Sequence, residues 1–411
     1  MPTGRLRADA QAFGRLTGWS YFPIAFAGRL PFAMMIVGVL TLVATARGSV
    51  AEAGVVAAAA GIGTAACGPG IGALADRAGQ RTVLILVSVV SILAGAGMLI
   101  AVAAAAPLIV LVAVAVVLGG STPQVSPFSR SRLVAFASLA ATAERRARAT
   151  SYVMSYESIA DEASFVIGPV LVGLLTALVH PAAPLIVAMA LTATAVIAFA
   201  LRSAPAMRDA ATAGAGRVAH QRLGSLLRTG RIPLLIAAMF LVGGVFGSTL
   251  TAVTAFMRER GQVEEAGVVY GAMSVGAILV ALAVAALPAR FTLAARWPVF
   301  AILGVAGGAA LALSGSLIAL VPALALSGCG VGAVLVTLFS LGAEAAPAGR
   351  ATTVLTALQS TLVVGQAVVT ALGGALVDTF GSSAGFWVAA ALVALLLVLG
   401  LINGRRRTST A

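Results

Sequence analysis

Lysine is missing from this 411-residue sequence, and histidine and cysteine are scarce. All 26 basic residues are arginine, beside two histidines and two cysteines. A Walker-type phosphate loop and a retinal Schiff base both need a lysine, so an ATP-driven motor and a retinal pump are excluded. His180, His220, Cys67 and Cys329 have no metal-ligand spacing, and the cysteines are expected to be buried free thiols. We therefore expect no enzyme activity, metal, cofactor or disulfide.

Charge is scarce as well. Only 9% of residues are charged, 60% are hydrophobic, and the mean hydropathy is +1.07. Such a composition predicts an integral membrane protein. The net charge of +13 does not indicate nucleic-acid binding, because the arginines lie between apolar runs and form no basic stripe interleaved with aromatics.

Apolar runs long enough to cross a bilayer are abundant. A span needs about 20 apolar residues, and on that basis the chain is an all-α membrane protein with twelve predicted spans. These are residues 22–46, 51–75, 82–105, 107–127, 150–178, 182–202, 233–256, 265–287, 298–315, 317–342, 352–377 and 383–403.

The distribution of arginine predicts the orientation. Twenty-two arginines fall at one set of span ends, and the opposite ends hold only Arg47, Arg258 and Arg260. We expect the protein to lie in the inner (plasma) membrane. The positive-inside rule then predicts that both termini are in the cytoplasm. The predicted organisation is an N-terminal tail (1–20), a six-helix bundle (21–203), a central loop (204–231), a second six-helix bundle (232–404) and a basic tail (405–411).

A short charged turn separates the second and third predicted spans. Residues 72–81 read G-A-L-A-D-R-A-G-Q-R, in which Gly72 allows close backbone approach and Asp76 can pair with an arginine or a helix N-terminus. Arg77, Gly79 and Arg81 complete the pattern, and the two arginines suit lipid headgroups. The pattern G-x-L-x-D-R-x-G-x-R resembles the loop signature of major facilitator superfamily transporters. The resemblance covers residues 20–404 and implies two pseudo-symmetric six-helix bundles; a weaker echo occurs at Leu287-Pro288-Ala289-Arg290.

Four charged residues lie in predicted spans away from the span ends, namely Arg29 in the first and Glu157, Asp161 and Glu162 in the fifth. Placing Arg or Asp in hydrocarbon costs at least about 2.5 kcal/mol on insertion scales, so such residues indicate function. Glu157 and Asp161 share a helix face, and Glu162 points about 100° away. We predict that these acids couple transport to protons and that Arg29 pairs with one of them. A static salt bridge is the alternative.

The acids are followed by Ser164-Phe165-Val166-Ile167-Gly168-Pro169-Val170-Leu171-Val172-Gly173. This segment resembles the fifth-helix antiporter motif G-x3-G-P-x2-G-G, with Ser164 and Val172 in place of two glycines. The resemblance implies a packing hinge at Gly168, Pro169 and Gly173; a generic Gly-Pro kink is the alternative. Exporters of this type often carry an arginine in the fourth span, and Leu108 to Gln124 contains none.

Uncharged polar residues also lie in predicted spans. Tyr156, Gln359 and Gln366 are candidates for lining a substrate cavity, although such residues also join membrane helices. Trp19, Trp297 and Trp387 fall near span ends and are expected to be interfacial anchors.

Together these features predict a monomeric secondary transporter with a small-molecule substrate, protons and membrane lipids as partners. The first hypothesis is multidrug-type efflux, in which a small amphiphilic cationic or neutral molecule leaves against proton entry by alternating access. Uptake or facilitated diffusion of a metabolite is a second hypothesis. A non-transporting sensor or scaffold on the same fold is a third, from another class.

Overall fold

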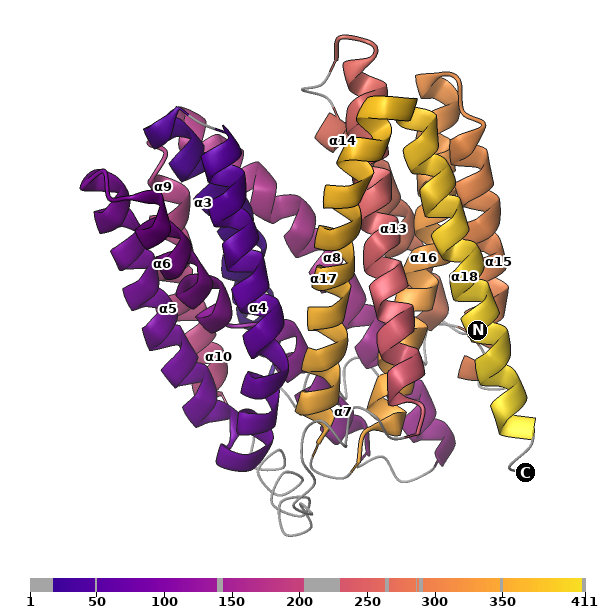
Figure 1. Ribbon diagram of the computed structural model, residues 1–411. Coiled ribbons are helices and arrows are strands. Elements are labelled where there is room, and N and C mark those ends of the chain that lie inside the picture. Colours follow the sequence, from indigo (N-terminus) through magenta and orange to yellow (C-terminus); the bar gives the residue numbers. More distant parts are fainter. Residues whose placement is uncertain are drawn as a thin grey trace. The chain divides into compact units, whose positions relative to one another are not determined.

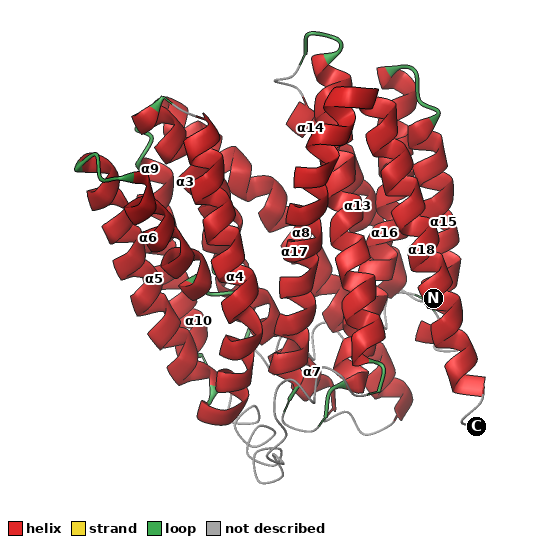
Figure 2. Ribbon diagram, in the orientation of Figure 1, coloured by secondary structure: helices red, strands yellow, loops and turns green. Residues whose placement is uncertain are grey.

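The computed structural model describes residues 18–48, 50–138, 143–202, 230–262, 266–285, 287, 291–347 and 350–408. Within this part of the chain every regular element is helical, as Figure 2 shows. Twelve helices are long and apolar enough to cross a membrane, which confirms the predicted fold class and span count. Most of the predicted central loop, including His220, and Pro288–Arg290 of the weaker motif lie outside the described residues.

The helices divide into two compact units that each contain parts distant in sequence. Unit 1 comprises Met1–Val153, Ser164–His220 and Pro347–Thr356, and unit 2 comprises Met154–Ala163, Gln221–Ala346 and Ala357–Ala411. The chain therefore changes unit within two of its helices, α8 and α17. Figure 1 shows these helices by label.

Unit 1 holds the first six spans apart from Met154–Ala163 of the fifth, and three of these spans are interrupted. The first is made of α2 and α3, the fourth of α6 and α7, and the sixth of α9, a π-helical turn and α10. The bounds are α2 Tyr21–Ala27, α3 Leu30–Arg47, α4 Val50–Ala78, α5 Gln80–Ala103, α6 Leu108–Ser121, α7 Val125–Ser138, α8 Ala143–Leu178, α9 Ala183–Leu191, the π turn Thr192–Val196 and α10 Ile197–Leu201.

Unit 2 holds six uninterrupted helices. They are α13 Ile232–Arg258, α14 Ala266–Ala285, α15 Leu293–Ala312, α16 Leu317–Ala345, α17 Ala351–Phe380 and α18 Ser382–Thr408. In this unit α16 packs against α14 and α15, and α18 packs against α13 and α15. Glycine makes the contacts close: a Cβ added at Gly330 would lie 2.2 Å from the backbone nitrogen of Gly304.

Unit 1 uses the same kind of contact where α4 meets α6. A Cβ added at Gly119 would lie 1.9 Å from the carbonyl oxygen of Ala60, and one added at Gly63 would lie 2.1 Å from that of Val116. Beside these glycines the Thr64 hydroxyl donates to the Gly119 carbonyl at 2.9 Å. Small residues therefore let two backbones pack directly in the apolar span.

Three sequence expectations are wrong in detail. The fourth span continues through α7 to Ala137, so Arg130 and Arg132, assigned to a loop from the sequence, lie inside it and are buried. Trp297 is fully buried and donates from Nε1 to the Leu396 carbonyl at 3.0 Å, so it joins α15 to α18 and is no interfacial anchor. Cys67 is exposed, although neither cysteine forms a disulfide. Periodicity within a uniformly apolar chain does not distinguish a buried face from an exposed one.

Candidate functional site

The charged turn of the motif joins α4 to α5 through a single glycine. Gly79 adopts φ +90°, which a residue with a Cβ rarely adopts, and α5 begins at the next residue. Arg77 and Arg81 on either side are exposed. Glycine is therefore required at position 79 by the geometry of the turn.

Asp76 binds the N-terminus of α17. Its carboxylate accepts hydrogen bonds from the backbone N–H of Thr353 at 2.7 Å and from the Thr353 hydroxyl at 2.5 Å. The first N–H groups of a helix have no intrahelical partner and carry a partial positive charge, so a carboxylate there is stabilised. Of the two partners expected for Asp76, the structure shows the helix terminus.

Gly72 makes room for this arrangement. A Cβ at this position would lie 2.0 Å from Oγ1 of Thr356 and 3.0 Å from the carbonyl oxygen of Thr352. The first turn of α17 can therefore approach α4 only because residue 72 has no side chain.

Gln80, an unspecified position of the motif, extends the same contact. Its Nε2 donates to the hydroxyls of Ser131 at 2.8 Å and Thr352 at 2.9 Å, while its Oε1 accepts from Nε of Arg132 at 2.8 Å. Both ends of the amide are thus used to join α5, α7 and the start of α17. Sequence reasoning missed Gln80, Thr352 and Thr353, because no pattern indicated that the start of the eleventh span meets this turn.

Arg132 completes the cluster. Its Nη1 donates to the carbonyls of Phe199 at 2.8 Å and Arg202 at 3.1 Å, and its guanidinium lies 4.2 Å from the centre of the Phe199 ring. The buried charge thereby satisfies carbonyls at the end of α10, which have no intrahelical donor. The fourth span carries arginine after all, in its second part.

The three acids lie on α8, in the portion that belongs to unit 2. Glu157 is fully buried, Asp161 is buried and Glu162 is half-buried. The Glu162 carboxylate accepts a hydrogen bond from the Ser274 hydroxyl and interacts electrostatically with Asp161 and Tyr270. Ser274 and Tyr270 lie one turn apart on α14, and the Tyr270 hydroxyl donates to the Phe246 carbonyl at 3.5 Å. The structure thus brings one predicted acid together with hydroxyls that sequence reasoning did not select.

Arg29 lies at the joint between α2 and α3. It is buried, and its Nη1 donates to the carbonyl of Ala25 at 2.8 Å. Because Arg29 belongs to unit 1 and the acids to unit 2, its pairing with one of them stays a prediction.

A family comparison decides what kind of chain this is. The model of the Major Facilitator Superfamily matches residues 21–370. The chain belongs to the major facilitator superfamily. It is therefore a multi-pass membrane transporter, and transporters of this superfamily are not enzymes.

Solved structures of similar fold include other superfamily transporters. The human organic anion transporter MFSD10 (TETRAN) is 19% identical with a TM-score of 0.71, covering 94% of this chain and 99% of that one. The E. coli fucose:proton symporter FucP is 15% identical with a TM-score of 0.69, covering 93% and 99%. A bacterial homologue of the iron transporter ferroportin is 17% identical with a TM-score of 0.71, covering 93% and 98%. None of the curated protein sequences matches the chain.

The antiporter-like motif of α8 is only partly a packing site. A Cβ at Gly168 would lie 2.8 Å from Cβ of Ala33, so this glycine lets α8 approach α3, and Ser164 is buried. Gly173 has nothing within 4 Å, and Pro169 lies within α8 without ending it. A close contact therefore exists at Gly168, the second glycine position of the motif, while the hinge itself stays a prediction.

The predicted cavity residues differ in exposure. Gln359 is buried, and Tyr156 and Gln366 are half-buried. A Cβ at Gly247 would lie 2.5 Å from the Gln366 carbonyl, so the Gln366 backbone is part of the contact between α13 and α17. Among the described residues no group of three His, Cys, Asp or Glu side chains is placed to hold a metal ion.

Proposed function

We propose that this superfamily member is a proton-driven antiporter that exports a small amphiphilic molecule, cationic or neutral. The observation that carries the proposal is Glu162, a carboxylate within a span, whose neighbours are another acid and two hydroxyls. None of these neighbours supplies a positive charge. An ionised carboxylate removed from water is costly unless it is paired, and taking up a proton removes that cost.

The two other acids extend the proton site along α8. Glu157 and Asp161 are buried on the same helix face, four residues apart. Protonation changes the charge of this helix face by one or more units. A proton that binds one conformation of the transporter more tightly than the other shifts the population toward that conformation. We infer that Arg29 serves as the positive counter-group that alternately holds and releases one of these carboxylates.

The acids also bear on substrate class. A substrate site lined by Glu157, Asp161 and Glu162 would favour cationic or neutral molecules over anions. The arginine distribution supports a plasma-membrane location with both termini in the cytoplasm and the motif turn on the cytoplasmic face.

Transport by purified protein in liposomes tests the proposal. With a pH-sensitive dye inside, addition of a transported cationic compound to the outside should drive protons out of the liposomes in exchange, so the internal pH should rise. Glu162→Gln should abolish this substrate-driven proton flux, Ser274→Ala should weaken it, and Glu162→Asp should restore part of it. Thr194→Ala is the matched control, because this exposed hydroxyl donates only to its own helix, to the Ala190 carbonyl.

The same assay decides between the hypotheses. Full proton flux in Glu162→Gln would overturn the assigned coupling residue. Flux of substrate in the same direction as protons would replace efflux by uptake through symport, the kind of transport for which the fold-similar fucose:proton symporter is named. Absence of any substrate-driven flux across a broad compound screen would favour the non-transporting alternative.

A further inference from the structure

The fourth span is broken in its interior. α6 ends at Ser121 and α7 begins at Val125, leaving Thr122, Pro123 and Gln124 outside both helices within a span that runs from Leu108 to Ala137. Proline cannot donate a backbone hydrogen bond and favours an extended residue before it, and Thr122 is extended, with ψ 121°. Irregular backbone at this depth occurs where it is buried in protein or lines a polar cavity.

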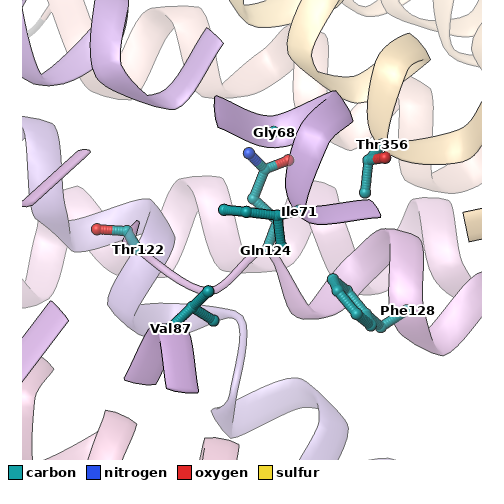
Figure 3. A pocket seen from close by; sticks show the side chains of 7 residues that line it. All are labelled: Gly68, Ile71, Val87, Thr122, Gln124, Phe128 and Thr356. Atoms are coloured by element: carbon teal, nitrogen blue, oxygen red, sulfur yellow. The ribbon is translucent and has the colours of Figure 1, made fainter. Parts of the chain in front are cut away.

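A small pocket opens at this break. It is lined by Thr122 and Gln124 of the break, by Phe128 of α7 and by residues of three other helices, namely Gly68, Ile71, Val87 and Thr356. Figure 3 shows the Gln124 side chain extending past Ile71, with its amide beside Gly68. The space accommodates about one water molecule, so any occupant is very small.

The pocket presents hydrogen-bond acceptors. Gln124 is 8% exposed, and its Oε1 is buried without a hydrogen-bond partner. The Thr122 hydroxyl donates its hydrogen bond to the Leu118 carbonyl at 2.7 Å, and the Thr356 hydroxyl donates to the Thr352 carbonyl at 2.7 Å. Each hydroxyl therefore has only lone pairs left to offer.

We propose that the break in the fourth span binds a monovalent cation of about the size of Na⁺, with Gln124 Oε1 as its main ligand and the hydroxyl oxygens of Thr122 and Thr356 as further ligands. Half-helix ends and unwound backbone in transporters form such ion sites. The ends of α6 and α7 carry opposite partial charges, so the side-chain oxygens decide the preference, and acceptors select a cation over an anion. A buried, unpartnered oxygen is costly, and the ion removes that cost.

This site is separate from the acids of α8 and does not rest on the proposed antiport. Binding can be measured without knowing the transported substrate. The probe is radioactive ²²Na⁺ on purified full-length protein in nanodiscs, at constant ionic strength with choline as the replacing cation. Thermal unfolding in NaCl, LiCl, KCl and choline chloride gives a second readout, because an ion that binds only the folded state stabilises it.

We expect saturable ²²Na⁺ binding and stabilisation by Na⁺ over both K⁺ and choline. Gln124→Leu should weaken binding by about tenfold or more, because even the loss of an outer-shell partner costs that much at metal sites, whereas Gln124→Glu should retain it. Thr122→Ala should weaken it less. Thr194→Ala is the matched control, because Thr194 also donates to a carbonyl four residues earlier and lies outside the pocket.

If Gln124→Leu fails to fold, Gln124→Asn tests the same oxygen with a smaller change of shape. If wild-type protein unfolds at the same temperature in all four chloride salts and shows no specific ²²Na⁺ binding, the proposal is overturned and the pocket holds a water molecule instead. Equal binding by Gln124→Leu would overturn it as well. Loss of proton coupling in Glu162→Gln with ²²Na⁺ binding unchanged would separate this site from the proposed antiport.

Discussion

The six spans of the first half differ from their counterparts in the second half. The first, fourth and sixth spans are interrupted, at Gly28–Arg29, at Thr122–Gln124 and at the π turn Thr192–Val196. The corresponding seventh, tenth and twelfth spans, α13, α16 and α18, are single helices. Within one superfamily fold, one half thus interrupts three of its spans, whereas the corresponding described spans of the other half are whole.

Proline alone does not explain the difference. α16 contains Pro322 and remains unbroken. Pro123 leaves the Gly119 carbonyl without its usual helical donor, and this carbonyl accepts instead from the Thr64 hydroxyl at 2.9 Å and from the Thr122 N–H at 3.3 Å. The Thr122 hydroxyl in turn donates to the Leu118 carbonyl at 2.7 Å. The break in the fourth span is thus accommodated by hydroxyls of the span itself and of the neighbouring α4.

The largest expected effect comes from the half whose helices are whole. In Gly330→Ala the new Cβ would lie 2.2 Å from the Gly304 nitrogen, a backbone atom that cannot move alone. We expect a loss of about 3 kcal/mol or more in stability, measured as a lower unfolding temperature in detergent. Gly271→Ala is the matched control, because nothing lies within 4 Å of a Cβ there; equal unfolding temperatures for the two variants would contradict the packing argument.

Asp76→Asn probes the motif contact in unit 1. The amide keeps an acceptor oxygen for Thr353 but loses the charge that the N-terminus of α17 stabilises, an effect of about 1 kcal/mol. We expect slower transport, by about fivefold to tenfold, with unchanged substrate affinity in detergent. Thr353→Ala, which removes one of the two donors, should have a smaller effect in the same direction. A large loss of affinity with an unchanged ratio of inward to outward conformations would argue against this role.

Arg29→Ala tests the predicted ion pair at the first interruption. Removing the guanidinium leaves a buried carboxylate without its counter-charge, so the single variant should be destabilised by about 1–3 kcal/mol. Neutralising the correct acid as well, by Glu157→Gln, Asp161→Asn or Glu162→Gln, should recover part of that loss. Strict additivity of thermal stability for all three double variants would show that no pair exists.

The smallest effects are expected at two arginines that occupy matching places in the two halves. Arg47, at the end of α3, donates to the Ala106 carbonyl and pairs with Glu52 at 2.5 Å. Arg260, just after α13, donates to the Gly315 carbonyl at 2.9 Å and lies 3.4 Å from the centre of the Phe256 ring.

Each alanine variant of these arginines should cost less than about 1 kcal/mol, since both side chains are partly exposed. Salt should reduce the effect of Arg47→Ala more than that of Arg260→Ala, because the Arg47–Glu52 ion pair is at 2.5 Å whereas Arg260 lies 4.0 Å from Glu259 and also contacts the Phe256 ring, which salt screens less. Thermal unfolding at low and high salt measures the difference, and identical salt dependence would remove the distinction.

Some of the candidate site was predictable from local pattern. Residues 72–81 indicated a tight charged turn, and Gly79 is required there by the local backbone, which has φ +90°. The partners of that turn were not predictable, because Thr352 and Thr353 lie more than 270 positions away and carry no motif of their own. The same limit applies to Ser274 and Tyr270 beside Glu162.

The sequence by itself determined that this is a membrane protein, how many spans it has and to which superfamily it belongs. Hydropathy and short motifs are properties of neighbouring residues, so they can be recognised without knowing any distant contact. Only the tertiary structure decided where the spans break, which arginines are buried and which helix end Asp76 binds. Those outcomes depend on contacts between distant segments. In a chain this uniformly apolar, several faces of each helix are equally able to be buried, and packing selects among them.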